Sequence, residues 1–142
     1  MKMLSILAAT FLFFAPTNWG TDFDKAKTTA VQEKKMILLS FSGSDWCVPC
    51  IKMKKDIFES DEFKKFADAN LVLVRADFPR LKKNKLDAAQ TKQNEKLAET
   101  YNPKGRFPYT VLLDGNGKVL KTWDGLPKLT PTNFVKQVKA GI

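Results

Sequence analysis

Short, nearly continuous runs of apolar residues alternate along the chain with longer segments whose apolar residues recur every three or four positions. The continuous runs predict buried strands, and the spacing of three or four predicts amphipathic helices. The last two runs are joined by Asp114-Gly115-Asn116-Gly117, which is typical of a hairpin turn. The predicted elements are helices at 21–35, 51–58, from 60, 86–101 and 131–138, and strands at 36–41, 71–77, 109–113 and 119–123.

The connections between these elements predict the fold class. Helical segments separate the strands at 36–41 and 71–77, and a helical crossover makes two strands of one sheet parallel. The hairpin makes the last two strands antiparallel. With 142 residues and a hydrophobic fraction of 44%, the chain is long enough for one domain with a single core. We therefore expect an α/β domain over residues 21–142, with a central mixed sheet of about four strands flanked by helices.

Both cysteines of the chain lie between the first strand and the helix after it, in the motif Trp46-Cys47-Val48-Pro49-Cys50. The strand breaks at a Gly-Ser turn, which places Cys47 at the helix N-terminus, where free N–H groups and the helix dipole favour a thiolate. Cys50 comes one turn later, on the apolar stripe of the helix. We expect Cys47 to be the exposed nucleophile, Cys50 to be the half-buried resolving thiol, and the two to form a redox disulfide.

Other uses of a cysteine pair agree less well with the sequence. A structural zinc site needs four Cys or His ligands, and this chain has two cysteines and no histidine, so one subunit cannot build that site. A disulfide that only clips a loop stabilises little when two residues separate its cysteines, because so short a loop hardly restricts the unfolded chain. The sequence therefore favours a redox-active pair and predicts no metal.

The motif resembles the active site of the thioredoxin superfamily, Trp-Cys-x-x-Cys, in which Pro often precedes the second Cys. The run from Phe41 to Cys47 is also similar to exported bacterial thioredoxin-like proteins, some of which are called disulfide isomerases. The resemblance implies a thioredoxin-like fold. Thioredoxins proper carry a buried Asp behind the second Cys, whereas the nearest residues here are Ser40 and Phe41. The Cys50 proton then needs another route, such as water, and we expect Asp45 to cap the helix or to face solvent.

Pro108 is the second feature that the resemblance marks. In the family a cis proline lies beside the Cys pair, just before an antiparallel strand, and Phe107-Pro108 has this place before Tyr109. The backbone at Phe107 would pair with an extended substrate segment, as in strand addition. The resemblance thus implies that Trp46, Phe107 and Pro108 form the apolar rim that binds a protein substrate. The alternative is an ordinary trans proline in a turn, because an X-Pro pair alone is weak support for a cis bond.

Residues 1–20 have the composition of an export signal. Lys2 precedes an apolar run from Leu4 to Ala15, which is shorter than the ~20 residues that span a bilayer and is typical of a signal h-region. The cleavage site is not defined, because Pro16 follows Ala15. We expect the protein to work in the bacterial periplasm or another extracytoplasmic space, with no stable membrane insertion after signal removal. A short buried N-terminal strand is the alternative.

The chain is basic, with a formal charge of +9, and part of this charge is concentrated in one connection. Residues 78–106 carry eight Lys or Arg and three acidic residues, a net charge of +5. The simpler interpretation is a solvated helix face, and the sharper hypothesis is that this insertion helps to select an acidic partner. Aromatic residues do not interleave with the lysines as a base-stacking platform requires, so we expect no nucleic-acid binding.

The thiols predict a thiol–disulfide oxidoreductase. The Cys47 thiolate attacks a disulfide of a protein substrate, and Cys50 then attacks the mixed disulfide and releases the reduced substrate. This chemistry needs an unidentified redox partner and no cofactor, and we expect a monomer. By the resemblance, strongly oxidising members carry a His between the cysteines, and its absence here favours a reductase or isomerase. The alternative is a non-enzymatic binding module of the same fold with a remnant Cys pair.

Overall fold

The computed structural model describes residues 18–142, so most of the predicted signal segment lies outside the described residues. The order of helices and strands predicted from the sequence is confirmed. The elements are α1 (Phe23–Glu33), β1 (Met36–Ser42), α2 (Val48–Met53), the π-helical turn η1 (Lys54–Phe58), α3 (Asp61–Asn70), β2 (Leu71–Asp77), the 3₁₀ turn η2 (Lys82–Asn84), α4 (Ala88–Tyr101), β3 (Tyr109–Leu113), β4 (Val119–Asp124) and α5 (Pro131–Ala140).

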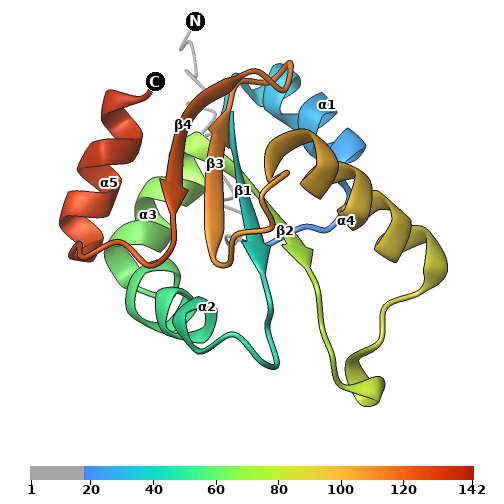
Figure 1. Ribbon diagram of the computed structural model, residues 1–142. Coiled ribbons are helices and arrows are strands. Elements are labelled where there is room, and N and C mark those ends of the chain that lie inside the picture. The colour runs from blue at the N-terminus through green and yellow to red at the C-terminus, as the bar shows by residue number, and fades with distance from the viewer. Residues whose placement is uncertain (1–17) are drawn as a thin grey trace, which may run out of the picture.

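The four strands form one mixed sheet in the order β2-β1-β3-β4, as Figure 1 shows at the centre of the molecule. The β1 and β2 strands are parallel, and β3 is antiparallel to both β1 and β4. The predicted mixed sheet of about four strands is therefore confirmed. The register places Ser40 of β1 between Arg75 of β2 and Thr110 of β3.

Helices cover both faces of the sheet because successive side chains of a strand point to opposite faces. On one face, Leu38 packs in a core with residues of η1, α3 and α5. On the other face, Ile37 and Leu39 pack in a second core with residues of α1 and α4. Figure 1 shows α2, α3 and α5 on one side of the sheet and α1 and α4 on the other. Ser40 is two residues from Leu38 and so faces the layer that contains α2.

Capping residues set the helix boundaries, and some differ from the predicted ones. Asp22 accepts a hydrogen bond from the Lys25 N–H, and Asp87 accepts one from the Gln90 N–H, so α1 and α4 begin two residues later than the sequence pattern suggests. Ser60 and Thr130 cap α3 and α5 in the same way. The helix predicted at 51–58 begins earlier, at Val48, and its last five residues form the π-helical turn η1.

The chain before α1 is joined to the sheet edge. Gly20 forms a parallel bridge with Val74 of β2. The Trp19 ring packs against Phe58, with centroids 4.9 Å apart, and lies 5.0 Å from the Arg75 guanidinium carbon. Within residues 18–142, no helix is long and apolar enough to cross a bilayer.

Candidate active site

A tight turn after β1 presents the cysteine motif. The Cys47 N–H donates to the Gly43 carbonyl at 2.8 Å, and the Trp46 N–H donates to the same carbonyl at 3.2 Å. The Trp46 indole folds back over this turn so closely that a Cβ on Gly43 would clash with the Trp46 Cε2 atom. Glycine at position 43 therefore allows the tryptophan to lie flat against the turn.

The two cysteines are joined by a disulfide at the first turn of α2, and their Cα atoms are 5.2 Å apart. Cys47 is the N-cap of the helix, as the sequence predicts, and its sulfur accepts a 3.3 Å hydrogen bond from the Cys50 N–H. Pro49 lies in the first turn, where its missing N–H removes no helical bond.

The burial of the cysteines differs from the expectation. We expected Cys47 to be exposed and Cys50 to be half-buried, but both are only 4% exposed. The expectation is wrong for the oxidised state, because the Cys47 sulfur is turned towards Cys50 and its N–H rather than towards solvent. The exposed residues of the motif are Val48, at 73%, and Pro49.

Trp46 is held on three sides by residues from distant parts of the sequence. Its Nε1–H donates to the Phe78 carbonyl at 2.7 Å. The Arg80 guanidinium carbon lies 3.7 Å from the centroid of the indole, which is a close cation–π contact. The Phe107 ring meets the indole edge-on, with centroids 5.5 Å apart, and also packs on Phe78 at 5.4 Å. The indole next to the nucleophile candidate is thus fixed in one orientation.

The Phe107-Pro108 peptide bond is cis, as the resemblance implies. Pro108 is buried, and it lies with Cys50 in the wall of the same cavity. Its carbonyl accepts a 2.8 Å hydrogen bond from the Gly125 N–H, which joins it to the end of β4. The structure therefore brings together the three residues predicted to form the substrate rim, Trp46, Phe107 and Pro108, around the cysteine pair.

Asp45 does not cap α2, so that expectation is wrong; it lies at the surface, as the other expectation has it, but its carboxylate is engaged by hydrogen bonds. Its carboxylate accepts hydrogen bonds from the Arg80 N–H at 2.9 Å, the Leu81 N–H at 3.0 Å and the Asn84 Nδ2 at 3.0 Å. These bonds, that from Arg80 first and that from Asn84 next, hold the pKa of Asp45 below its ordinary value of 3.8. The side chain points away from the helix because Cys47 already occupies the cap position.

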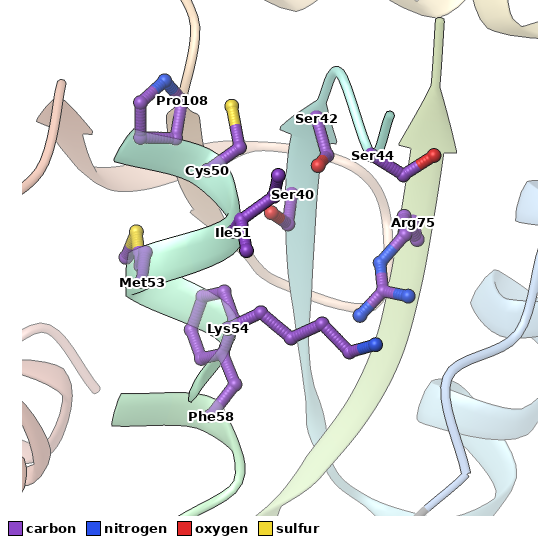
Figure 2. A pocket seen from close by; sticks show the side chains of 10 residues that line it. All are labelled: Ser40, Ser42, Ser44, Cys50, Ile51, Met53, Lys54, Phe58, Arg75 and Pro108. Carbon is purple, nitrogen blue, oxygen red and sulfur yellow. The ribbon is translucent and has the colours of Figure 1, made fainter. Parts of the chain in front are cut away.

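A cavity of about 160 Å³ lies behind Cys50, between α2 and the sheet. Figure 2 shows it between the helix that carries Cys50 and the strands that carry Ser40, Ser42 and Arg75. It is large enough for several water molecules. Among the described residues that line it there is no Asp or Glu, and hydroxyl groups of Ser40 and Ser42 take the place next to the cysteine.

Two cations also line this cavity, Lys54 from η1 and Arg75 from β2 (Figure 2). Burial lowers the pKa of Arg75 below its ordinary value, and the charges of Asp77 and Glu59 act in the opposite direction. An arginine remains protonated at neutral pH even so. Lys54 also pairs with Glu59 at 3.6 Å, but Glu59 does not line the cavity, so the charged groups that face Cys50 are cations, and a nearby cation favours a thiolate.

Three features of this site were not identified from the sequence. They are the packing of the Trp46 indole on Gly43, the contacts of Asp45 and the position of Arg75. Gly43 had a signal, since a glycine directly after a buried strand often marks a close approach of backbone or side chain. The other two depend on contacts between residues more than 30 positions apart. Within the described part of the chain, no group of three or more His, Cys, Asp or Glu residues is placed to hold a metal ion.

Comparisons with known proteins agree with this geometry. A family model described as "Thioredoxin-like" matches residues 18–115. The disulfide bond reductase DsbH of Chlamydia pneumoniae is 45% identical to this chain over 89 residues, which are 63% of this chain and 52% of DsbH. The matched region thus spans about half the length of that relative.

Solved structures extend the similarity to nearly the whole chain. A structure described as "DsbH Oxidoreductase" is 34% identical, covers 99% of this chain and 91% of its own, and superposes with a TM-score of 0.80. A disulphide isomerase from Xylella fastidiosa, 18% identical, superposes with a TM-score of 0.61 over 83% of this chain and 86% of its own, which supports the fold alone. The predicted thioredoxin-like fold is confirmed, and the chain belongs to the thioredoxin-like family.

Proposed function

We propose that this protein is a thiol–disulfide oxidoreductase that reduces or isomerises disulfides of protein substrates. The observation that carries the proposal is the Cys47–Cys50 disulfide at the N-terminus of α2, beside the cis bond before Pro108. The names of the relatives, a disulfide bond reductase and an oxidoreductase, support the same activity. Trp46, Phe107 and Pro108 would form the apolar surface on which the substrate segment lies.

The proposed reaction begins with the reduced protein. The Cys47 thiolate attacks one sulfur of the substrate disulfide, forms a mixed disulfide and releases the other substrate sulfur as a thiolate. Cys50 then loses its proton and attacks the Cys47 sulfur, which restores the Cys47–Cys50 disulfide and releases the second substrate thiolate. Two electrons pass to the substrate, and an external dithiol donor must return them to the cysteine pair.

The direction of the reaction depends on the reduction potential of the pair, and this is the experiment that tests the proposal. We expect the purified protein to equilibrate in dithiothreitol or glutathione buffers and to reduce insulin disulfides. A potential near ~−270 mV identifies a reductase, and one near ~−180 mV an isomerase. A value near ~−120 mV would contradict both and indicate an oxidase. A pair that does not cycle would instead support the alternative, a non-enzymatic binding module.

The route for the Cys50 proton is also part of the proposal. The Ser40 and Ser42 hydroxyls and water in the cavity would relay this proton to bulk solvent, since no carboxylate lines the cavity among the described residues. Lys54 and Arg75 would stabilise the thiolate that results. The relay would affect the rate of the second step, whereas stabilisation of the thiolate favours the reduced form of the pair.

Replacing Arg75 with methionine is therefore expected to lower the reduction potential by roughly 10–30 mV, because up to about a tenfold loss of stability of the reduced form corresponds to ~30 mV. The potential is read from the oxidised fraction in redox buffers at pH 7. Arg75→Lys is the matched control, since it keeps the charge with a different shape, and it should stay close to the wild type. Equal shifts in both variants would contradict a charge effect and indicate a packing effect through Trp19.

We also propose that residues 1–20 direct export and that 21–142 form the working domain in the periplasm. The apolar run after Lys2 supports the export signal. Gly20 pairs with β2 and Trp19 packs on η1, so the folded domain begins close to residue 20. A reducing partner outside the cytosol then becomes necessary, since disulfides form and persist in that environment.

A further inference from the structure

The segment of residues 79–86, here called the basic loop, is fastened to the cysteine motif. In Figure 1 it is the yellow-green excursion between β2 and α4. Asp45, two residues before Cys47, accepts its three hydrogen bonds from this loop, at Arg80, Leu81 and Asn84. These bonds therefore fix the position of the loop relative to the Cys47 sulfur.

The lysines of the basic loop are not held in ion pairs, although the carboxylates of Asp45, Asp77 and Asp87 lie close to the loop. Lys82, Lys83 and Lys85 are exposed, and none of them makes an ion pair within the described part of the chain. The acidic residues around the loop are already engaged by hydrogen bonds. Asp77 accepts from the Ser44 N–H and hydroxyl, and the Asp87 side chain caps α4.

A groove of about 350 Å³ runs between the basic loop and α4. Phe78, Leu81 and Leu86 are its apolar lining residues, and its charged lining residues are Arg80, Lys82, Lys85 and Asp77. Leu81 is 48% exposed, so its side chain is accessible to an apolar side chain of another molecule.

The groove is continuous with the candidate active site. Arg80 lines the groove and at the same time stacks on the Trp46 indole, at 3.7 Å from its centroid. Phe78 lines the groove, accepts the indole N–H with its carbonyl and packs on Phe107. A polypeptide that crosses Trp46 and Phe107 to reach Cys47 would meet the groove directly.

We propose that this groove selects the substrate: it binds the residues that flank the target disulfide when these are acidic and include an apolar side chain. The apolar side chain would enter between Leu81 and Leu86, and the Asp or Glu side chains would meet Lys82, Lys83 and Lys85. The inference rests on the proposed function and adds the chemical class of the substrate. Charge complementarity identifies the occupant, since three cations, Arg80, Lys82 and Lys85, line an apolar groove beside the cysteines, and Lys83 lies exposed on the same loop.

The test uses three disulfide-linked peptides of equal length with one leucine beside the cysteine and flanks of Glu, Gln or Lys. We expect kcat/KM for reduction to be about tenfold higher for the Glu peptide than for the Lys peptide at low salt, as electrostatic steering and pairing allow. The ratio should shrink at high salt because exposed charges are screened. Equal kcat/KM values for the Glu and Lys peptides would overturn the inference.

Two triple variants distinguish the effect of the groove on the peptide preference from the effect of the protein's net positive charge. Lys82→Glu/Lys83→Glu/Lys85→Glu is expected to reverse the preference. The matched control, Lys65→Glu/Lys118→Glu/Lys136→Glu, changes the net charge by the same amount through exposed lysines on α3, the β3–β4 hairpin and α5. This control should keep the wild-type ratio. An equal loss in both triple variants would mean that net charge acts at long range and would refute a local site.

Asp45→Ala gives an independent test of positioning. It removes the three hydrogen bonds to the basic loop while making the protein more positive. If positioning matters, the preference for the Glu peptide falls towards unity; if only charge matters, the preference rises, which would contradict the inference. The Gln peptide has uncharged flanks, so its reduction tests the proposed function separately from the charge preference. If the wild-type protein reduces none of the three peptides, the oxidoreductase activity is disproved, and the result does not count against the groove.

Discussion

Replacing Cys47 with serine is expected to abolish disulfide reduction, with a loss of about 10³-fold or more in the rate of insulin reduction. The hydroxyl of serine cannot form the mixed disulfide, and Cys50, the other of the two cysteines in the sequence, is proposed to act second. Stability should change little by comparison, because two residues separate the cysteines and the disulfide closes only a short loop. The activity is measured by insulin turbidity with dithiothreitol as donor, at substrate concentrations below KM.

Cys50→Ser is the matched control for this variant. It keeps the Cys47 nucleophile but lacks the resolving thiol, so a covalent mixed disulfide with the substrate should accumulate and be visible by mass spectrometry. Cys47→Ser should form no such adduct. An adduct that formed instead through Cys50 in Cys47→Ser would reverse the two roles, and the same absence of adduct in both variants would remove the proposed mechanism.

The fold could be predicted from the sequence because its signals are local. Each buried strand is a short apolar run, as with β1 and β2, and the Asp114–Gly117 segment makes the expected turn, with Asp114 Oδ1 accepting from the Asn116 and Lys118 N–H groups. The ends of the helices were predicted less accurately than the strands, because a single capping side chain decides where each helix begins. Several polar residues precede each helix, and only the folded chain shows that Asp22 and Asp87 act as caps.

The site could be predicted only where its residues are neighbours in sequence or follow a family pattern. The cysteine pair at the helix start is a local feature, and the cis bond at Pro108 was implied by the resemblance. The role of Asp45 could not be predicted, because its partners lie 35 to 39 positions away. The burial of Cys47 could not be predicted either, since it depends on the disulfide, which turns the sulfur inwards.

Arg75 illustrates the same limit. In the sequence it is the one charged residue inside an apolar run, and a polar residue near the end of a strand is ordinary. Only the parallel register of β1 and β2 places it beside Ser40, on the face that carries α2. A cation and a serine then share the cavity behind Cys50, where the family resemblance had led us to look for a carboxylate.

The largest loss of stability is expected from Phe134→Ala in α5. Phe134 is fully buried, and its ring lies 4.9 Å from Trp123 and 6.0 Å from both Phe58 and Phe63, centroid to centroid. Removing a buried phenylalanine ring costs about 3–5 kcal/mol of unfolding free energy, because the lost transfer energy is joined by the cost of the cavity left behind. The midpoint of thermal unfolding should fall by roughly 10–20 °C for a domain of this size, measured by circular dichroism on the oxidised protein.

The effect of this change should reach the active site, because Phe58 belongs to η1, which continues the helix that carries the cysteines. Loosening the aromatic cluster therefore weakens the support of α2 from the side opposite the substrate. Phe134→Leu is the matched control: it keeps most of the apolar volume and should cost about 1–1.5 kcal/mol. A loss of unfolding free energy below ~1 kcal/mol for Phe134→Ala would mean that the neighbouring rings move in and fill the cavity. The aromatic cluster would then not be what holds the Cys50 helix against the sheet.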